Sequence, residues 1–196
     1  MSVSPGFRGK RGFDLTRLPP GQYPTEDFPV LSAGPTPQVA EQDWRFTVTN
    51  EAGLEKTWSW ADFMRLPQED VTTDIHCVTR WSKFDTTWRG VALDTLLADT
   101  AADFAVAHCH GGYTTNLPLE DLLDGKAWLV HEFDGFPLSP EHGGPVRLLV
   151  PHLYFWKSAK WIRGITLADT DEPGFWEAGG YHNYGDPWRE QRTWND

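Results

Sequence analysis

Alternation of hydrophobic and polar residues predicts a series of short strands along the chain. WRFTVTN, residues 44–50, alternates apolar and polar positions, which is typical of a half-buried strand. FAVAHCH, residues 104–110, is typical of a buried strand, and another strand is expected to run into Cys77. AWLVHEFDGFPL, residues 127–138, predicts a strand that leads to an Asp-Gly turn. Two further strands are expected on either side of a basic loop, at residues 144–151 and 160–167.

Three short segments have the apolar spacing of helices. SWADFMRLP, residues 59–67, predicts a short helix that Ser59 caps and Pro67 ends. Helices are also predicted for GVALDTLLADT, residues 90–100, and for LPLEDLLDG, residues 117–125, which a glycine stops. Because predicted strands outnumber predicted helices and the two kinds are mixed in order, we expect an α+β fold.

The two ends of the chain lack such periodicity. Residues 1–40 carry many prolines and glycines without a helical or strand period, which predicts an extended N-terminal arm. We expect residues 41–196 to form one domain with the arm packed on it, because a chain of 196 residues can bury one substantial core and no repeat or long linker divides it. The last part, residues 171–196, is an aromatic, glycine-rich tail with little regular pattern.

The charge balance argues against some classes of partner. The chain has 17 Lys and Arg residues against 28 Asp and Glu residues, a formal net charge of −11. Such a field repels phosphate, so non-specific binding to nucleic acid or to an anionic membrane is not expected. The sequence has no stretch of about twenty apolar residues for a membrane helix and no apolar run of a secretory signal. We therefore expect a cytoplasmic protein whose two cysteines stay reduced.

Cys77 stands at the end of a predicted strand with basic residues close by in the sequence, namely His76, Arg80 and Lys83. A cationic neighbourhood lowers the pKa of a thiol and so raises the thiolate fraction, as a nucleophile or a metal ligand requires. The alternative is a buried thiol that only fills space.

Cys77 also belongs to a group of side chains that could bind zinc or copper. The group comprises His76, Cys77, His108, Cys109 and His110. On a strand, His108 and His110 would face one side and Cys109 the other, so a single tetrahedral site cannot easily use all three. Polar side chains satisfied by ordinary hydrogen bonds are the alternative.

Two later segments suit an anionic ligand. In EHGGPVRLLVP, residues 141–151, a glycine turn exposes backbone N–H groups, and Arg147 can bind a phosphate through two hydrogen bonds. In FWKSAKWIRG, residues 155–164, two lysines and a serine lie between aromatic residues, and a solvated cationic loop is the alternative there. The sequence has neither a P-loop nor a dinucleotide-binding glycine motif, so a phosphorylated cofactor of another kind must be considered.

Three stretches resemble a known family. They are CVTRWSKFDTTWRGVAL, GGYTTNLPLEDLL, and EHGGPVRLLVP followed by KSAKWIRGI. Over roughly residues 20 to 185, the chain resembles the molybdopterin-binding domain of the sulfite oxidase family, including its bacterial periplasmic methionine sulfoxide reductase branch. The resemblance implies mixed sheets with short helices, molybdenum and molybdopterin as cofactors, and oxygen-atom transfer to or from a small sulfur or nitrogen oxide.

The resemblance assigns roles to individual residues. Cys77 would ligate molybdenum, a role that suits a soft thiolate. Apart from the resemblance, Arg80 and Lys83 would attract an oxyanion at the substrate, and Tyr113 on the GGYTTN turn would donate a hydrogen bond there; carboxylate pairing of the two cations and a structural role of Tyr113 are the alternatives. The residues expected to contact the cofactor are Gln22, Thr25, Glu26, His110, His142, Arg147, Ser158, Ala159 and Lys160.

The chain also departs from its longer relatives. Animal and plant sulfite oxidases have C-x-x-N-R-R at the metal site, whereas this chain has Cys-Val-Thr-Arg-Trp-Ser-Lys, so a sulfite pocket is not assured. The chain has no room for a haem domain, and we therefore expect a small-molecule substrate and a separate electron-transfer partner. Two alternatives remain at this point: a cofactor-free binding module on the same scaffold, and a zinc or copper protein.

Overall fold

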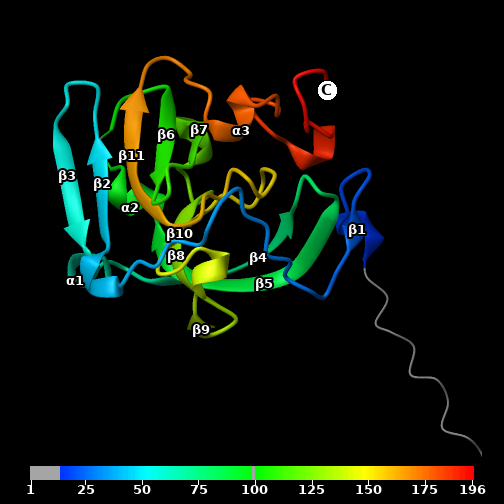
Figure 1. Ribbon diagram of the computed structural model, residues 1–196, viewed down its shortest axis with the longest axis horizontal. Helices are drawn as coiled ribbons and strands as arrows, with labels where there is room; N and C mark the ends of the chain where they lie inside the picture. The colour runs from blue at the N-terminus through cyan, green and yellow to red at the C-terminus, as the bar shows by residue number, and fades with distance from the viewer. Residues whose placement is uncertain (1–13, 99) are drawn as a thin grey trace, which may run out of the picture.

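Two β-sheets form the body of the protein in a computed structural model that describes residues 14–98 and 100–196 (Figure 1). The first sheet has the strand order β1-β5-β8-β10, with β4 also paired to β5 and β9 to β8. Its strands are β1 (Tyr23–Pro24), β4 (Glu69–His76), β5 (Trp81–Ala92), β8 (Trp128–Phe133), β9 (Phe136–Pro137) and β10 (Arg147–Leu149).

The second sheet has five strands in the order β3-β2-β11-β6-β7. Its strands are β2 (Arg45–Thr49), β3 (Glu55–Ser59), β6 (Phe104–Cys109), β7 (Thr114–Pro118) and β11 (Ile162–Ala168). Strands β11 and β2 are parallel, and the other pairs are antiparallel. Segments far apart in the sequence therefore lie side by side.

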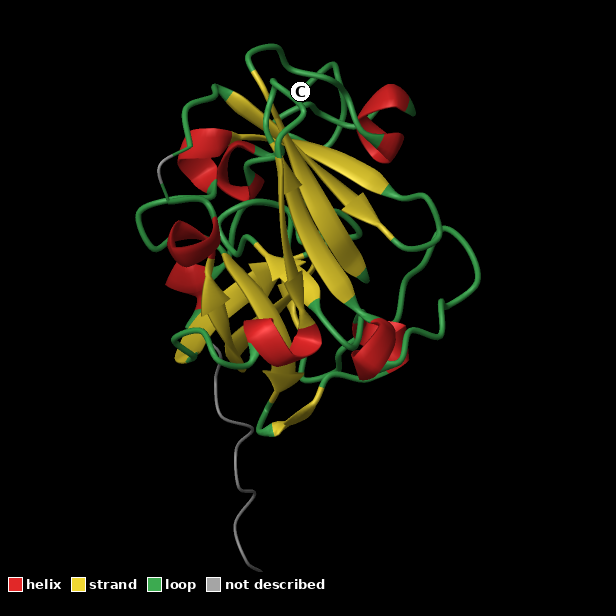
Figure 2. Ribbon diagram, turned by 90° about the vertical axis from the view of Figure 1, so that its left-hand side faces the viewer, coloured by secondary structure: helices red, strands yellow, loops and turns green. Residues whose placement is uncertain are grey.

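Helices are short and lie around the strands (Figure 2). The α-helices are α1 (Trp60–Phe63), α2 (Leu93–Leu96) and α3 (Phe175–Ala178). Single 3₁₀ turns occur at Leu15–Arg17, Glu41–Asp43, Leu119–Asp121, Pro140–His142 and Pro187–Arg189. In the described part of the chain, no helix is long and apolar enough to cross a membrane.

The main hydrophobic core combines residues from both sheets, including Phe46 of β2, Leu129 of β8 and Ile165 of β11. A smaller core on the first sheet contains Cys77 together with Trp81. Burial of these apolar side chains is the main force that holds the sheets together.

Several predicted elements are confirmed. The expected strands at residues 44–50 and 104–110 are β2 and β6, and the strand before Cys77 is β4. Helix α1 begins where the sequence predicts, because the Ser59 hydroxyl accepts a hydrogen bond from the backbone N–H of Asp62 while the Asp62 carboxylate accepts one from Ser59.

Two predicted helices are largely wrong. Among the described residues of the range 90–100, which leave out residue 99, only α2 is helical, because Val91 and Ala92 pair with β8 as the end of the long strand β5. In residues 117–125, Leu117 and Pro118 belong to β7, which leaves a single 3₁₀ turn. Strand pairing with a distant segment overrides local helical spacing in both places. In the arm, residues 1–13 lie outside the described part, and the rest is mostly irregular but includes β1.

Candidate cofactor pocket

A cavity of about 440 Å³ lies between the arm, the turn after β4, the segment after β10 and the C-terminal tail. Much of the predicted site lines this one cavity. The predicted residues on its wall are Cys77, His110, Tyr113, His142, Arg147, Ser158, Ala159 and Lys160.

Cys77 occupies the corner of the hairpin that joins β4 to β5. Its backbone C=O accepts a hydrogen bond of 2.9 Å from the N–H of Arg80, and its own N–H donates one of 2.9 Å to the C=O of Trp81. Arg80 closes the turn with a φ of 79°. The Cys77 sulfur accepts a hydrogen bond of 3.1 Å from the Thr79 hydroxyl, and the residue is 7% exposed. The hairpin thus holds a buried thiol on the cavity wall.

The predicted cationic surroundings of Cys77 are not observed. Arg80 is exposed and does not line the cavity, and the Lys83 Nζ donates to the C=O of Glu26 at 2.6 Å. Burial lowers the pKa of His76 to about 4, so its ring is neutral at pH 7. Burial raises the pKa of the Cys77 thiol, although the hydrogen bond from Thr79 lowers it in part. The expectation of a thiolate made by basic neighbours is therefore wrong, whereas coordination to a metal deprotonates a thiol directly.

Arg147 and Lys160 place positive charge on another part of the wall. Arg147 is 2% exposed and donates to the C=O groups of His142 at 2.9 Å and Ser158 at 2.5 Å. The Lys160 Nζ donates to the C=O groups of Leu31 at 2.7 Å and Glu141 at 2.9 Å. Neither cation forms a salt bridge with a carboxylate in the described part of the chain.

Burial and neighbouring positive charge lower the pKa values of three groups at this end of the cavity. Burial lowers the pKa of Arg147 to about 9, and burial together with Arg147 lowers that of Lys160 to about 8. Burial, then Arg147, then Lys160 lower the pKa of His142 to about 4. The charge of Arg147 opposes protonation of Lys160, and both charges oppose protonation of His142. This end of the cavity therefore suits an anionic group.

The remaining wall offers polar atoms without protein partners. The Nε1 of Trp81 and the Nε2 of His110 are buried and have no hydrogen-bond partner among the described residues. Leaving such atoms unpaired is costly, and a bound ligand would satisfy them. Beside His110, Gly111 and Gly112 have positive φ values of 86° and 85°, which favour glycine. A soft thiol, two cations without a carboxylate partner and unpaired ring nitrogens together fit a soft metal carried by an anionic organic cofactor.

Two tyrosines on the cavity wall, Tyr113 and Tyr181, differ in the hydrogen bonding of their hydroxyl groups. The Tyr113 hydroxyl donates to the C=O of Trp156 at 2.8 Å, which indicates the structural alternative. Tyr181 also lines the cavity, and its hydroxyl forms no hydrogen bond with the described residues. Burial raises the Tyr181 pKa, and nearby Cys77 raises it further. Tyr181 stacks on Trp176 with ring centroids 4.9 Å apart, which fixes its ring.

Sequence reasoning missed Tyr181 because the tail has no regular period, although its aromatic composition was the available signal. In the folded chain the backbone N–H of Tyr181 donates to the C=O of Trp176 at 3.0 Å. An irregular turn thus brings both rings to the cavity.

Four predicted residues lie outside the cavity wall: Arg80, Gln22, Thr25 and Glu26. Gln22 supports the cysteine turn instead, since its Nε2 donates to the C=O of Cys77 at 3.1 Å. Thr25 is tied to β5 by its N–H, which donates to the C=O of Ser82 at 2.8 Å. The arm reaches the cavity further along the chain, where the Phe28 ring stacks on His142 with centroids 3.8 Å apart.

The predicted histidine and cysteine cluster does not assemble. His108 lies on β6 in the second sheet, with its Nε2 3.0 Å from the Thr166 hydroxyl, whereas His76 is the last residue of β4 in the first sheet and Cys77 follows it. Across residues 14–98 and 100–196, no group of three or more His, Cys, Asp or Glu side chains is arranged to hold a metal ion. The zinc or copper alternative therefore has no support here.

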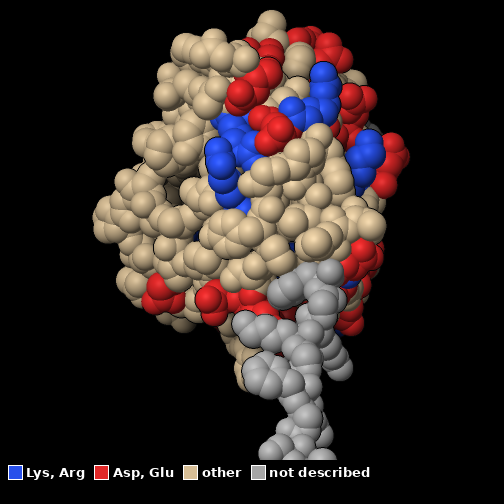
Figure 3. All heavy atoms as spheres, turned by 90° about the vertical axis from the view of Figure 1, so that its right-hand side faces the viewer, with Lys and Arg blue, Asp and Glu red and all other residues tan. Residues whose placement is uncertain are grey.

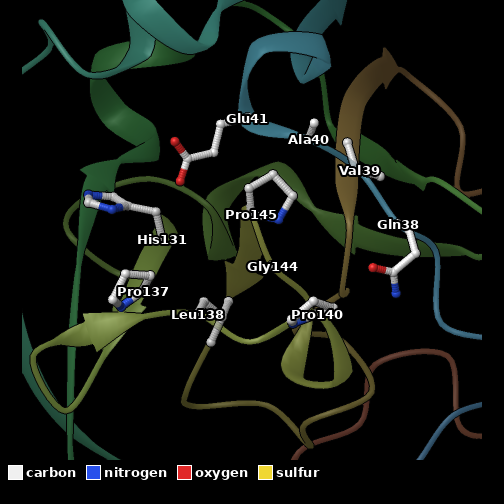
Figure 4. A pocket seen from close by; sticks show the side chains of 10 residues that line it. All are labelled: Gln38, Val39, Ala40, Glu41, His131, Pro137, Leu138, Pro140, Gly144 and Pro145. Carbon is white, nitrogen blue, oxygen red and sulfur yellow. The ribbon is translucent and has the colours of Figure 1, made fainter.

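A second cavity, of about 430 Å³, contains none of the predicted site residues (Figure 4). Glu41 and His131 line one side of it, and prolines including Pro145 line another. The Nε2 of His131 is 3.1 Å from the Gln68 side-chain oxygen, so this ring already has a partner.

The face that carries β1 and the tail shows mixed charge (Figure 3). Lys and Arg side chains gather there beside Asp and Glu side chains. Arg17, for example, forms salt bridges with Asp74 and Asp85, and Arg192 pairs with Glu190. Arg17 and Arg192 are thus paired with carboxylates, whereas Arg147 and Lys160 in the cavity are not.

Comparison with known proteins identifies the class. Residues 33–176 match the oxidoreductase molybdopterin binding domain family, and the chain belongs to that family, whose cofactor is molybdenum held by molybdopterin. The chain is 44% identical over 187 residues to the uncharacterized oxidoreductase YuiH of Bacillus subtilis, covering 91% of this chain and 93% of that protein. It is 29% identical over 184 residues to the putative protein-methionine-sulfoxide reductase subunit YedZ1 of Azospira oryzae, covering 88% and 70%.

The fold has a solved counterpart in the sulfane dehydrogenase SoxCD from Paracoccus pantotrophus, with a TM-score of 0.61 and 21% identity. The match covers 69% of this chain and 41% of that chain. The predicted α+β, sulfite oxidase-type molybdopterin-binding fold is confirmed, as is the resemblance to that family.

Proposed function

We propose that the protein transfers an oxygen atom to or from a small sulfur or nitrogen oxide, with Cys77 as the protein ligand to molybdenum. One observation carries the proposal: the Cys77 thiol lines the same cavity as Arg147 and Lys160, two cations that donate to backbone carbonyls and have no carboxylate partner among the described residues. The bound molybdenum cofactor supplies the two-electron oxygen-transfer chemistry.

The residues of the chain bind the cofactor and orient the substrate. Arg147 and Lys160 hold the anionic end of the cofactor, the indole N–H of Trp81 donates to its polar atoms, and the Nε2 of His110 donates to or accepts from them according to its tautomer. Tyr181 presents a hydroxyl to the substrate oxygen, where a fixed donor stabilises developing negative charge. Phe28 and the tail aromatics exclude water from the cavity, which strengthens these interactions.

The substrate need not be an anion. Arg80, which would attract an oxyanion, lies outside the cavity wall, and this favours a neutral oxide over sulfite. The name of the relative YedZ1, a putative protein-methionine-sulfoxide reductase subunit, supports a sulfur oxide substrate. The same name describes a subunit, which supports a separate electron-transfer partner for this chain.

Metal and pterin analysis of purified protein tests the proposal, with Cys77→Ser and Cys109→Ser as matched variants. Both thiols are buried, but only Cys77 lines the cavity. Wild type should carry molybdenum and molybdopterin and transfer oxygen from a sulfoxide with an artificial electron donor. Cys77→Ser should abolish transfer, and Cys109→Ser should retain most of it.

Absence of molybdenum from wild type would favour a cofactor-free binding module. Equal activity in wild type and Cys77→Ser would remove Cys77 from the metal site.

A further inference from the structure

A buried ion pair lies directly behind the cavity wall. The Lys157 Nζ is 2.7 Å from the Glu177 Oε1, and both side chains are 0% exposed. The same Nζ donates to the C=O of Asn116 at 2.7 Å, to its side-chain oxygen at 3.1 Å, and to the C=O of Asn183 at 2.7 Å. Neither Lys157 nor Glu177 lines the cavity.

The same carboxylate oxygen of Glu177 accepts further hydrogen bonds. Its Oε1 accepts from the Thr115 hydroxyl at 2.7 Å and from the Trp156 indole at 2.9 Å. Its backbone C=O accepts from the Trp194 indole at 2.9 Å. The other carboxylate oxygen, Oε2, is buried and has no hydrogen-bond partner among the described residues, so the bonds that offset the desolvation of this charge all converge on Oε1.

The pair joins segments that form different walls of the cavity. Lys157 immediately precedes Ser158, Ala159 and Lys160, which line the cofactor side. Glu177 belongs to α3 and follows Trp176, on which Tyr181 stacks. The tail also approaches β7 closely: a Cβ on Gly174 would lie 2.5 Å from the Cα of Thr115.

We infer that Lys157 and Glu177 act as positioning residues that hold the Trp176 and Tyr181 wall in register with the cofactor-binding segment 158–160. The inference rests on the proposed function for its kinetic consequence. It is distinct from a purely structural role, in which the pair would stabilise the fold without setting the place of Tyr181.

The experiment uses Lys157→Met, Glu177→Gln and the double variant, with Lys56→Met, at an exposed position of β3, as control. A single substitution leaves one buried charge without its partner, so Lys157→Met should lower Tm and cofactor content. The double variant removes both charges and should recover most of both. Its kcat/KM per bound molybdenum should nevertheless stay about tenfold or more below wild type, since the bonds that join the walls are lost.

A double-mutant comparison shows whether the effect passes through Tyr181. In a Tyr181→Phe background the Lys157→Met and Glu177→Gln pair should reduce kcat/KM little further, because coupled residues are not additive. If the loss of kcat/KM from Tyr181→Phe and the loss from the double variant multiplied in full, the two effects would be independent and the inference would be overturned. Wild-type kcat/KM in a double variant with restored Tm and cofactor content would also overturn it.

A readout in cofactor-free protein separates this inference from the proposed function. With 3-fluorotyrosine incorporated, the ¹⁹F resonance of Tyr181, assigned by its loss in Tyr181→Phe, should shift or broaden in the double variant. The resonance of the exposed Tyr23 should not change. An unchanged Tyr181 resonance would overturn the positioning role, whereas absence of molybdenum in wild type would overturn only the proposed function.

Discussion

The hydroxyl of Thr79 donates a hydrogen bond of 3.1 Å to the sulfur of Cys77. The two residues belong to one tight turn, so the donor is held in place by the hairpin itself. Burial raises the pKa of this thiol, and the Thr79 bond acts in the opposite direction. Thr79 therefore favours the thiolate that a metal ligand must provide.

Replacement of Thr79 by Val should reduce the thiolate fraction of Cys77 in cofactor-free protein. A hydrogen bond of this kind contributes about 0.5 to 1.5 kcal/mol, so thiol alkylation at a fixed pH should slow by roughly 2- to 10-fold. Alkylation rates measured across pH on a Cys109→Ser background report Cys77 alone. Thr72→Val, at an exposed position of β4, is the control. Identical rates in Thr79→Val and wild type would contradict the prediction.

Tyr181 and Tyr113 should differ when each is replaced by Phe. Loss of a fixed donor to the substrate oxygen lowers kcat by roughly 100- to 1,000-fold in other enzymes, so Tyr181→Phe should lower kcat/KM strongly. Tyr113→Phe removes a bond to the C=O of Trp156 and should instead lower the free energy of unfolding by about 1 kcal/mol. Steady-state kinetics and denaturant unfolding of both variants distinguish the two roles, and equal kinetic losses would argue against the assignment.

Arg147→Ala should weaken retention of the cofactor. Removal of one side of a buried charge-assisted hydrogen bond costs on the order of 2 to 5 kcal/mol, or roughly thirty- to several-thousand-fold in affinity. The molybdopterin that remains after dilution and dialysis measures the effect. Arg163→Ala, at an exposed position of β11, removes the same charge outside the cavity wall and should retain the cofactor. Full retention by Arg147→Ala would remove Arg147 from the cofactor site.

Cofactor retention should depend on pH through Lys160. Its pKa is lowered to about 8, so the ammonium group is charged below about pH 8 and loses its charge as the pH rises through that value. Retention of an anionic cofactor should therefore fall as the pH rises past 8. Lys160→Arg should move that fall to higher pH, because a guanidinium group keeps its proton. Dialysis of both proteins at pH values on either side of 8 measures the shift, and coincident profiles would contradict it.

Local sequence patterns located most of the strands and the main part of the cavity wall. Strand alternation depends on neighbouring residues, which is why β2, β4 and β6 were predictable. The segments around Cys77, Arg147 and Lys160 each keep their distinctive residues within a few positions of one another. Their family resemblance therefore appears in the linear sequence.

The tertiary structure decided the properties that depend on distant segments. Pairing with β8 turned Val91 and Ala92 into strand, and the shape of the Cys77 turn left Arg80 outside the cavity. Burial then raised the pKa of Cys77 where its basic neighbours in sequence predicted the opposite. The places of Tyr181 and of the Lys157–Glu177 pair are set where the tail packs on β7 and on the segment after β10. Burial and electrostatic interaction depend on distance in space, and only the folded chain sets that distance.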